Sequence, residues 1–367
     1  MMHELTPPDF AKTRPLFTPL SHCLTIDAIL TGTTTGRVWV DDVRVPETAV
    51  CWANHRVYAG GRERPQLAAF FADTFVPIAQ ADGREGVTLH LPPDWHSDVA
   101  DFFPQTYPAQ RPRFYFRQDA RQREWPLTVP PDVALRPVDA ALLADPSITN
   151  LDYVTEEMLS ERPSIAAFLA NSFGRCLVHE NKIVGWCMSE YNTGPRCELG
   201  IETAVPFRRR GLATLMATGT IRHALAQGVY DIGWLCWADN TPSIATAKKL
   251  GFHQTAYDEA VYSVSFNPAV ALGVRGNGHL LAGRYAQALA DYQQAMQQAT
   301  VPGWVFWNTA VTHLKLNQPQ DAFAYLRQAI AAGFNDRAFM LNSPHWQPYH
   351  DTEEWTAVLQ TLDEQEQ

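Results

Sequence analysis

The chain has 367 residues, which is enough for two or three domains with buried cores. Its 29 basic and 39 acidic side chains give a formal net charge of −10, and this argues against nucleic-acid binding, which usually requires a basic face. No run approaches the roughly 20 consecutive apolar residues of a membrane helix, so no membrane association is expected.

Cysteine usage indicates the compartment. The six cysteines are widely spaced and form no Cys-x-x-Cys pair, a pattern that fits free buried thiols better than a disulfide framework. Residues 1–14 contain no apolar core of signal-peptide length. We therefore expect a cytoplasmic protein. The twelve histidines show no zinc-ligand spacing, so we expect no metal site.

The first region, residues 1–127, is expected to form an α/β lobe. Short runs rich in β-branched and aromatic residues predict strands at 36–40, 49–52, 86–91 and 113–116. Residues 67–79 carry Leu and Phe at helical spacing. No chemical motif stands out in this region, and the prolines of 126–131 indicate its end.

The second region, residues 128–267, alternates strand and helix patterns. Strands are predicted at 134–137, 175–179, 182–186, 198–203 and 231–236, and helices at 211–227 and 242–250. Glu180 and Asn181 form a hairpin-like turn between two of these strands. Gly228 follows the long helix where a left-handed cap is expected.

The third region, residues 268–367, is predicted to be helical and carries an internal repeat. Ala288 and Ala322 are 34 residues apart, as are Ala295 and Ala329. The small residues at this spacing resemble the tetratricopeptide pattern, in which paired helices approach closely. Two units are visible, 272–302 and 306–336, and a closing helix is predicted at 355–362.

The stretch 197–214 carries the most chemical information. A strand ends at Thr203 and a helix begins near Gly211. The N–H groups of a first helical turn lack intrahelical acceptors, and with the helix dipole they form a site for phosphate or pyrophosphate. Gly211 and Ala213 keep bulky side chains away, and residues 208–210 are three arginines. The plain structural alternative is a capped helix with a solvated basic turn.

Two motifs in register carry a family resemblance. Arg208-x-x-Gly211-x-Ala213 resembles the Arg/Gln-x-x-Gly-x-Gly/Ala pyrophosphate motif of the GNAT (GCN5-related) N-acetyltransferases. The segments 240–243 and 247–252 resemble the family's second cofactor segment, in which an Asn and a small or hydroxyl residue precede a helix ending in Leu-Gly-Phe. The element order between the motifs is also similar to that of the family.

The resemblance extends to a two-lobed subgroup and covers about residues 20–265 at uneven strength. It implies a GNAT fold, with a mixed central sheet flanked by helices, at 128–267. A degenerate GNAT-like α/β lobe would precede it at 1–127, and an all-α tetratricopeptide-like module would follow at 268–367. The N-terminal lobe carries none of the cofactor residues and is expected to support the site or face the substrate.

The resemblance also implies acetyl-CoA as co-substrate. The pantetheine arm would lie against the strand ending at Thr203, and the thioester would lie where that strand parts from the strand 231–236. The residues expected to bind the cofactor are Ile201, Thr203, Arg208, Arg209, Arg210, Gly211, Leu212, Ala213, Thr214, Asn240 and Ser243.

Two carboxylates are candidate catalytic residues. Glu198 and Glu202 lie four residues apart on one predicted strand, so both point to the same side of the sheet. Either could take a proton from an attacking amine, directly or through water. The alternatives are a strand-end carboxylate satisfied by amides for Glu198, and pairing with an arginine for Glu202. The family's general-acid tyrosine falls on Ala247 here, which leaves the source of a leaving-group proton open.

The leading hypothesis is therefore an acetyl-CoA-dependent N-acetyltransferase that acts on an amine of a small or medium molecule by direct attack on the thioester. Self-resistance chemistry on an amine-bearing antibiotic is a variant of this activity. The alternatives are an acyl-CoA-binding sensor and a protein-acetylating module, with the helical repeats docking a protein or peptide partner.

Overall fold

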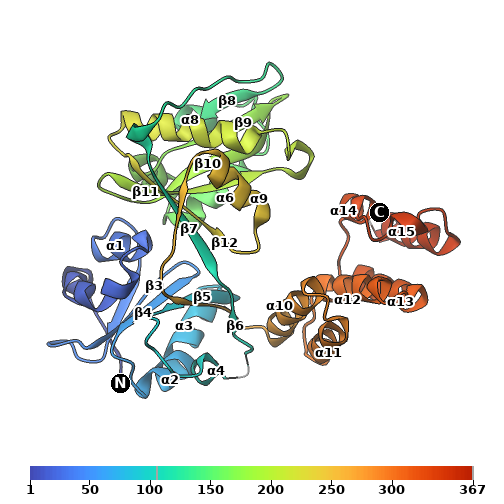
Figure 1. Cartoon of the computed structure of the whole chain (residues 1–367), viewed down its shortest axis with the longest axis horizontal. Coiled ribbons are helices and arrows are strands. Elements are labelled where there is room, and N and C mark those ends of the chain that lie inside the picture. The colour runs from blue at the N-terminus through green and yellow to red at the C-terminus, as the bar shows by residue number, and fades with distance from the viewer. Residues whose placement is uncertain (105, 366–367) are drawn as a thin grey trace. The chain divides into compact units, whose positions relative to one another are not determined.

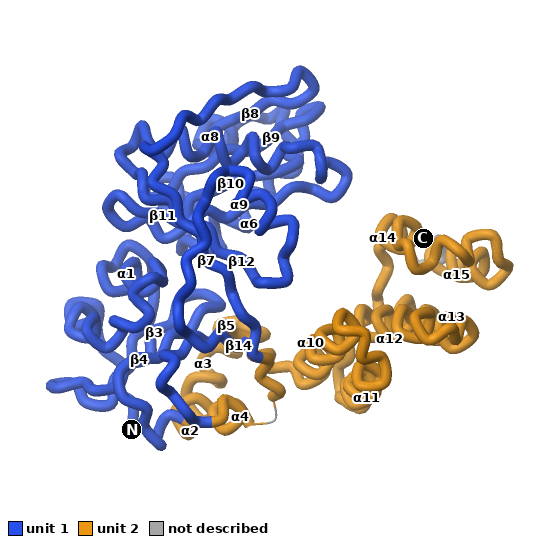
Figure 2. The backbone as a smooth tube through the Cα atoms, viewed as in Figure 1, with its two compact units in different colours: residues 1–67, 88–97, 110–262 blue, residues 68–87, 98–109, 263–367 orange. Residues whose placement is uncertain are grey.

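The computed structural model describes residues 1–104 and 106–365, shown in Figure 1. The chain divides into two compact units (Figure 2), one formed by residues 1–67, 88–97 and 110–262 and the other by residues 68–87, 98–109 and 263–367. Within the described residues, no helix combines the length and the apolar character needed to cross a membrane.

A seven-stranded mixed sheet forms the centre of the first unit, with the order β13-β7-β12-β11-β10-β9-β8. Its strands are β7 (Arg113–Asp119), β8 (Ala134–Pro137), β9 (Gly174–His179), β10 (Lys182–Thr193), β11 (Arg196–Thr203), β12 (Asp231–Trp237) and β13 (His253–Thr255). Strands β11 and β12 run parallel, whereas the other recorded pairs in this sheet are antiparallel. The mixed sheet confirms the expected fold class.

Helices cover this sheet. They are α5 (Ala140–Leu143), α6 (Asp152–Glu161), α7 (Ile165–Asn171), α8 (Leu212–Ala226) and α9 (Thr241–Lys249). Helix α8 packs on β9, β10 and β11 through Met216, Ala217 and Ile221, which have no exposed surface and recur at helical spacing. The helix predicted at 211–227 thus forms, with Gly211 as its N-cap.

Two predicted turns are confirmed by their backbone angles. Glu180 and Asn181 both have positive φ, 47° and 63°, as a tight hairpin between β9 and β10 requires. Gly228 ends the α8 segment with a φ of 78°, the left-handed conformation that glycine adopts at least cost.

A second sheet has the order β1-β2-β3-β4-β5-β14-β6. Its strands are β1 (His3–Glu4), β2 (Arg37–Val40), β3 (Thr48–Ala53), β4 (Arg56–Gly61), β5 (Gly86–Leu91), β6 (Ala109–Gln110) and β14 (Ala260–Ser265). Helix α1 (Leu24–Leu30) packs against β3 and buries Ile26 and Ile29 in the same apolar core as Val38 and Cys51. The strands predicted at 36–40, 49–52 and 86–91 belong to this sheet.

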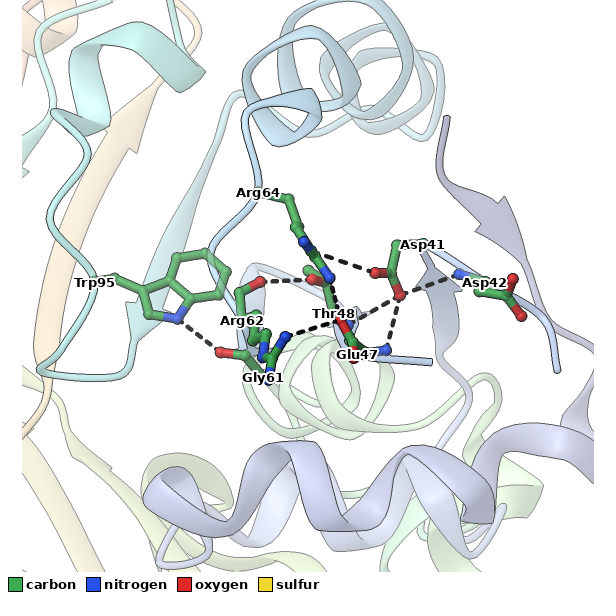
Figure 3. Close-up of polar contacts among 8 residues, drawn as sticks. All are labelled: Asp41, Asp42, Glu47, Thr48, Gly61, Arg62, Arg64 and Trp95. Atoms are coloured by element: carbon green, nitrogen blue, oxygen red, sulfur yellow. Dashed lines mark hydrogen bonds and ion pairs between the residues drawn. The ribbon is translucent and has the colours of Figure 1, made fainter. Parts of the chain in front are cut away.

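The loop between β2 and β3 is held by a carboxylate (Figure 3). Asp41 Oδ1 accepts hydrogen bonds from the backbone N–H groups of Glu47 and Thr48, both at 2.9 Å. Arg64 contacts Asp41 at 3.7 Å and also forms an ion pair with Glu47. This network fixes the loop that joins β2 to β3, in the sheet that also contains β4.

The two sheets exchange strands across the limits predicted from the sequence. The strand predicted at 113–116 forms as β7, but it lies between β12 and β13 rather than in the N-terminal sheet. Conversely, β14 comes from the region 128–267 and belongs to the N-terminal sheet. Phe116 explains the placement of β7, because its ring is buried with Trp234 in the core beneath α8. The domain limits at 127 and 267 remain a prediction.

The second unit is mainly helical. Its helices after residue 263 are α10 (Pro268–Leu281), α11 (Tyr285–Ala295), α12 (Gly303–Lys315), α13 (Pro319–Ala331), α14 (Arg337–Asn342) and α15 (Glu353–Gln365). The repeated alanines at 288, 295, 322 and 329 have no exposed surface, which fits close helix approach. The all-α character of this region is confirmed, and its tetratricopeptide identity remains a prediction. Near its N-terminal end, the unit also holds most of α2 (Gln66–Phe70), a π-helical turn (Phe71–Phe75), α3 (Val76–Ala81) and α4 (Val99–Phe102).

The placement of β7 predicts the effect of truncating its central side chain. Phe116→Ala should destabilise the chain by about 3–5 kcal/mol, because it opens a cavity in the core under α8. Leu159→Ala, at a half-exposed position on α6, should cost less than about 0.5 kcal/mol. Urea unfolding followed by tryptophan fluorescence measures both. Equal costs would contradict the assignment of β7 to this core.

Candidate active site

The parallel strands β11 and β12 part from each other near their start. Their pairing begins with Arg196 opposite Asp231 and ends with Glu198 opposite Gly233. Beyond that point β11 stays paired with β10, and β12 stays paired with β7. In the described part of the chain, the edge of β11 from Leu199 onward therefore has no pairing with β12. This is the separation of strands that was expected to receive the thioester.

A cavity of about 180 Å³ lies in this opening. It is lined by residues 198–201 of β11 and 234–237 of β12, and by Asn240 and Ser243 at the start of α9. Arg56 of β4, Arg113 of β7 and Glu190 of β10 complete its wall. The cavity thus has a free strand edge on one side and ionisable side chains on the other.

Glu198 lies at the apex of the opening and is only 4% exposed. Its Oε2 atom is 4.0 Å from Nη1 of Arg56 and has no hydrogen-bond partner among the described residues. Burial raises the pKa of Glu198, although the charges of Arg56 and Arg113 oppose the increase. A carboxylate with a raised pKa and a free oxygen can accept a proton at neutral pH.

Glu190 lies directly opposite Glu198 in the antiparallel register of β10 and β11. Its Oε2 atom is 3.5 Å from Nη2 of Arg56, so one guanidinium contacts both carboxylates. Burial and the nearby charge of Glu161 raise the pKa of Glu190 well above its usual value. Gly200 makes this arrangement possible, because a Cβ atom there would collide with the Glu190 carboxylate.

Helix α6 brings two more glutamates to the same region. Tyr153, Glu157 and Glu161 are spaced four residues apart and share one face of α6, which packs on β10. Carboxylate oxygens of Glu157, Glu161 and Glu190 lie within 4.8 Å of one another. Burial, with the charge of Glu161, raises the pKa of Glu157 to about 7. We call these three residues the acidic cluster.

The second candidate catalytic residue does not reach the cavity. Glu202 is exposed and is absent from the cavity wall, although it lies on the same face of β11 as Glu198. Burial and the charge of Glu202 together raise the pKa of Tyr153. Of the two carboxylates singled out in the sequence, the structure therefore brings only Glu198 to the opening.

The basic turn has the backbone geometry of an anion site. Arg209 and Gly211 both have positive φ, 60° and 77°, and α8 begins at Leu212. The Gly211 N-cap provides no side-chain acceptor for the first helical turn. The Leu212 side chain is buried in the core, and Ala213 and Thr214 are partly buried. These residues can therefore contribute mainly their N–H groups to a ligand.

The three arginines of this turn differ in their partners. Arg208 donates from Nε to the carbonyl oxygen of Thr203 at 2.8 Å, which fixes the turn against the end of β11. Arg210 forms an ion pair with Asp132, and its hydrogen bond lowers the pKa of that carboxyl. Arg210 is therefore engaged in an ion pair, whereas Arg208 is held by a backbone carbonyl and borders the uncapped turn together with Arg209.

Asn240 and Ser243 reach the cavity but also have structural roles. The Asn240 side chain accepts a hydrogen bond from the Ser243 N–H at 3.2 Å and caps α9. The Ser243 hydroxyl accepts a bond of 2.9 Å from Nε1 of Trp234. Ala247, at the position of the family tyrosine, is fully buried in the core, so it offers no proton donor.

A second buried network lies beside the apex. Glu259 contacts His22 at 3.3 Å and His90 at 3.1 Å, and it accepts a hydrogen bond from Tyr115. Although burial raises its pKa, the contacts with both histidines lower the pKa of Glu259 below its usual value. This carboxylate is fully engaged and serves to join the segment before β14 to β5 and β7.

Sequence reasoning missed Arg56, Glu190 and the two glutamates of α6, Glu157 and Glu161. The four-residue spacing of Glu157 and Glu161 was a usable signal, because it places both on one helix face. Glu190 could have been found from its hairpin register opposite Glu198. Arg56 carried no such signal, since it lies 134 residues from its partner Glu190.

Parallel strands that part beside an uncapped helix N-terminus define an acyltransferase of the GNAT class. A family model described as GNAT acetyltransferase matches residues 14–259, and the chain belongs to this family. The match covers more than half of the chain and ends before α10. GNAT acetyltransferases in general use acetyl-CoA, and transfer of an acetyl group is the activity of the family.

The chain is also similar to individual proteins. The uncharacterized N-acetyltransferase YdfB of Bacillus subtilis (strain 168) is 26% identical over 266 residues, which are 71% of this chain and 98% of that protein. A GCN5-related N-acetyltransferase-like protein from Streptococcus suis 89/1591 has a TM-score of 0.50 and 17% identity, covering 70% of this chain and 98% of its own. A tandem GNAT protein from the clavulanic acid biosynthesis pathway has a TM-score of 0.45 and 15% identity, covering 72% and 98% respectively.

The raised pKa of Glu157 predicts that ionisation of this carboxyl lowers the free energy of unfolding. Because the folded protein binds the proton more tightly than the unfolded chain, this group stabilises the fold at low pH, and that contribution is lost as pH rises through about 7. Glu157→Gln should therefore gain stability over the wild type by on the order of 1–2 kcal/mol at pH 8 and much less at pH 5.

Urea unfolding at the two pH values measures this difference. Glu156→Gln, which changes an exposed glutamate on the same helix, is the matched control and should show no such trend. A gain for Glu157→Gln that is the same at pH 5 and pH 8 would contradict the burial of an ionisable carboxyl here.

Proposed function

We propose that this chain transfers the acetyl group of acetyl-CoA to the amine of a small or medium molecule that binds in the cavity between β11 and β12. The observation that carries the proposal is the state of Glu198 at the point where the two strands part. Its carboxylate is buried, and its Oε2 atom has no hydrogen-bond partner among the described residues. A base is required because an aliphatic amine is protonated at neutral pH and cannot attack a carbonyl in that form.

The residues at the site fit the donor. The uncapped first turn of α8 and the adjacent Arg208 and Arg209 would hold the pyrophosphate. The free edge of β11, including Ile201 and Thr203, would exchange main-chain hydrogen bonds with the pantetheine arm. Asn240 and Ser243 would border the same arm from the start of α9. When bound, acetyl-CoA supplies an acyl carbon activated for attack.

Glu198 would take one proton from the acceptor ammonium, and the amine nitrogen would then bond to the acyl carbon. The carbon–sulfur bond breaks and coenzyme A leaves as the thiolate. The nitrogen then releases its second proton, which passes through solvent to that thiolate, so that atoms and charge balance. Backbone N–H groups on the free edge of β11 can donate to the carbonyl oxygen as it gains negative charge. No side chain is needed as a general acid, which accords with the buried Ala247.

Arg56 would set the protonation of this site. Its guanidinium lies against both Glu198 and Glu190, and the positive charge favours the ionised form of each carboxylate. Burial acts in the opposite direction. The guanidinium would thus offset part of the free-energy cost of burying negative charge in the cavity.

Two substitutions separate catalysis from donor binding. Glu198→Gln should keep the calorimetric affinity for acetyl-CoA within about threefold and lower kcat for thiol release by about 10²–10⁴-fold, because only proton removal is lost. Arg208→Glu should abolish acetyl-CoA binding, because it reverses a charge at the pyrophosphate turn. Arg222→Glu, at an exposed position of α8, is the matched control and should bind normally.

Thiol release against a panel of primary amines provides the readout. Full turnover by Glu198→Gln would exclude Glu198 as the base. Stabilisation by acetyl-CoA without release from any amine would replace the enzyme with an acyl-CoA sensor.

A further inference from the structure

The acidic cluster has more negative than positive groups. Glu161 and Glu190 are only 6% and 9% exposed, and Glu157 is partly buried beside them. The Arg56 guanidinium that contacts Glu190 also contacts Glu198. Arg162 is next to Glu161 in the chain, but it donates to Ser172, to the Thr33 carbonyl and to Thr34. Burying several carboxylates with so little positive charge is costly unless protons or a cation compensate them.

Two buried polar atoms near this cluster lack hydrogen bonds. Neither Oε2 of Glu161 nor the hydroxyl of Tyr191 has a hydrogen-bond partner among the described residues, although Tyr191 is only 1% exposed. Buried polar atoms are normally paired, so each of these has a free position for a donor or acceptor. Tyr191 adopts a φ of 49° at a shift in the β10 register, which sets its side chain apart from the regular strand.

Aromatic rings border the carboxylates. The guanidinium carbon of Arg56 lies 4.9 Å from the centroid of the Tyr191 ring, so this ring already faces a cation. Tyr153, which shares a helix face with Glu157 and Glu161, packs edge-to-face on Trp186 with centroids 6.5 Å apart. Carboxylates combined with aromatic faces are typical of sites for alkylammonium groups, whose methylene units lie on the rings.

We propose that the acidic cluster binds the distal ammonium group of a linear diamine or polyamine, whose other amine is acetylated beside Glu198. The inference rests on the proposed function and specifies its acceptor. Glu190 connects the two positions, because it belongs to the cluster and also lines the transfer cavity. The two positions therefore have one carboxylate in common.

A divalent metal ion fits the cluster less well. The same three carboxylates could supply oxygen ligands, but Arg56 lies 3.5 Å from Glu190 and would repel a doubly charged ion more strongly than a single ammonium. Hard cations also prefer six or more oxygen ligands, whereas the Tyr191 ring lies beside Arg56 next to these carboxylates.

Calorimetric titration of the full chain tests the inference without relying on turnover. The probes are 1,4-diaminobutane and butan-1-amine, which differ only in the distal ammonium. The wild type should bind the diamine at least about tenfold more tightly. Glu161→Gln should remove about tenfold of the diamine affinity and leave the monoamine within about twofold. Glu157→Gln, which keeps the shape of the cluster, should act in the same direction.

Glu156→Gln is the control, since it removes an exposed carboxylate from the same helix and should retain the preference. Equal binding of the two amines, or an equal preference in Glu161→Gln and Glu156→Gln, would overturn the inference. Binding of Mg²⁺ or Mn²⁺ alone that Glu161→Gln abolishes, without diamine binding, would instead assign a metal site. A retained diamine preference without thiol release would reject acetyl transfer but not the cation site.

Discussion

A single buried guanidinium organises the site. Arg56 belongs to β4 of the N-terminal sheet, and its side chain contacts one carboxylate from β10 and one from β11. Buried charges of one sign persist only when an opposite charge or a proton compensates them. The position of Arg56 therefore requires β4 to lie beside β10 and β11 within the first compact unit. This requirement gives the degenerate lobe a physical role, because it supplies the cation that the site needs.

The opening between β11 and β12 provides the other half of the site. Pairing that stops at Glu198 leaves main-chain groups of β11 free and places a carboxylate at the apex. Strand β7 supports this geometry from the far side of β12, where it pairs along the whole of Arg113–Asp119. The placement of β7 beside β12, rather than in the N-terminal sheet, is thus part of what keeps β12 in place while it leaves β11.

Local patterns predicted the local backbone conformation. The basic turn at 208–213, the hairpin at Glu180 and the cap at Gly228 depend on residues adjacent in the chain, and each adopts the expected backbone conformation. Glu198 was also identified, because its position at the start of the strand fixes it beside the opening. Glu202 was placed on the correct face, but its exposure depends on which neighbours cover the end of β11.

Contacts between distant segments could not be read in the same way. The pairing of Arg56 with Glu190 joins residues 134 positions apart, and that of Arg210 with Asp132 joins residues 78 positions apart. Strand β7 resembled any other short strand, and its sheet was determined by the burial of Phe116 in the core beneath α8. The periodicity of a single sequence does not indicate which distant segments pair in the folded protein.

The most direct measurement is a crystal structure of the chain with acetyl-CoA. The central claim is that transfer occurs in the cavity between β11 and β12. It predicts the pyrophosphate at the first turn of α8, the pantetheine arm along Leu199 to Thr203, and the acetyl group in the cavity beside Glu198 and Glu190. An acetyl group held outside that cavity, away from both carboxylates, would contradict the account.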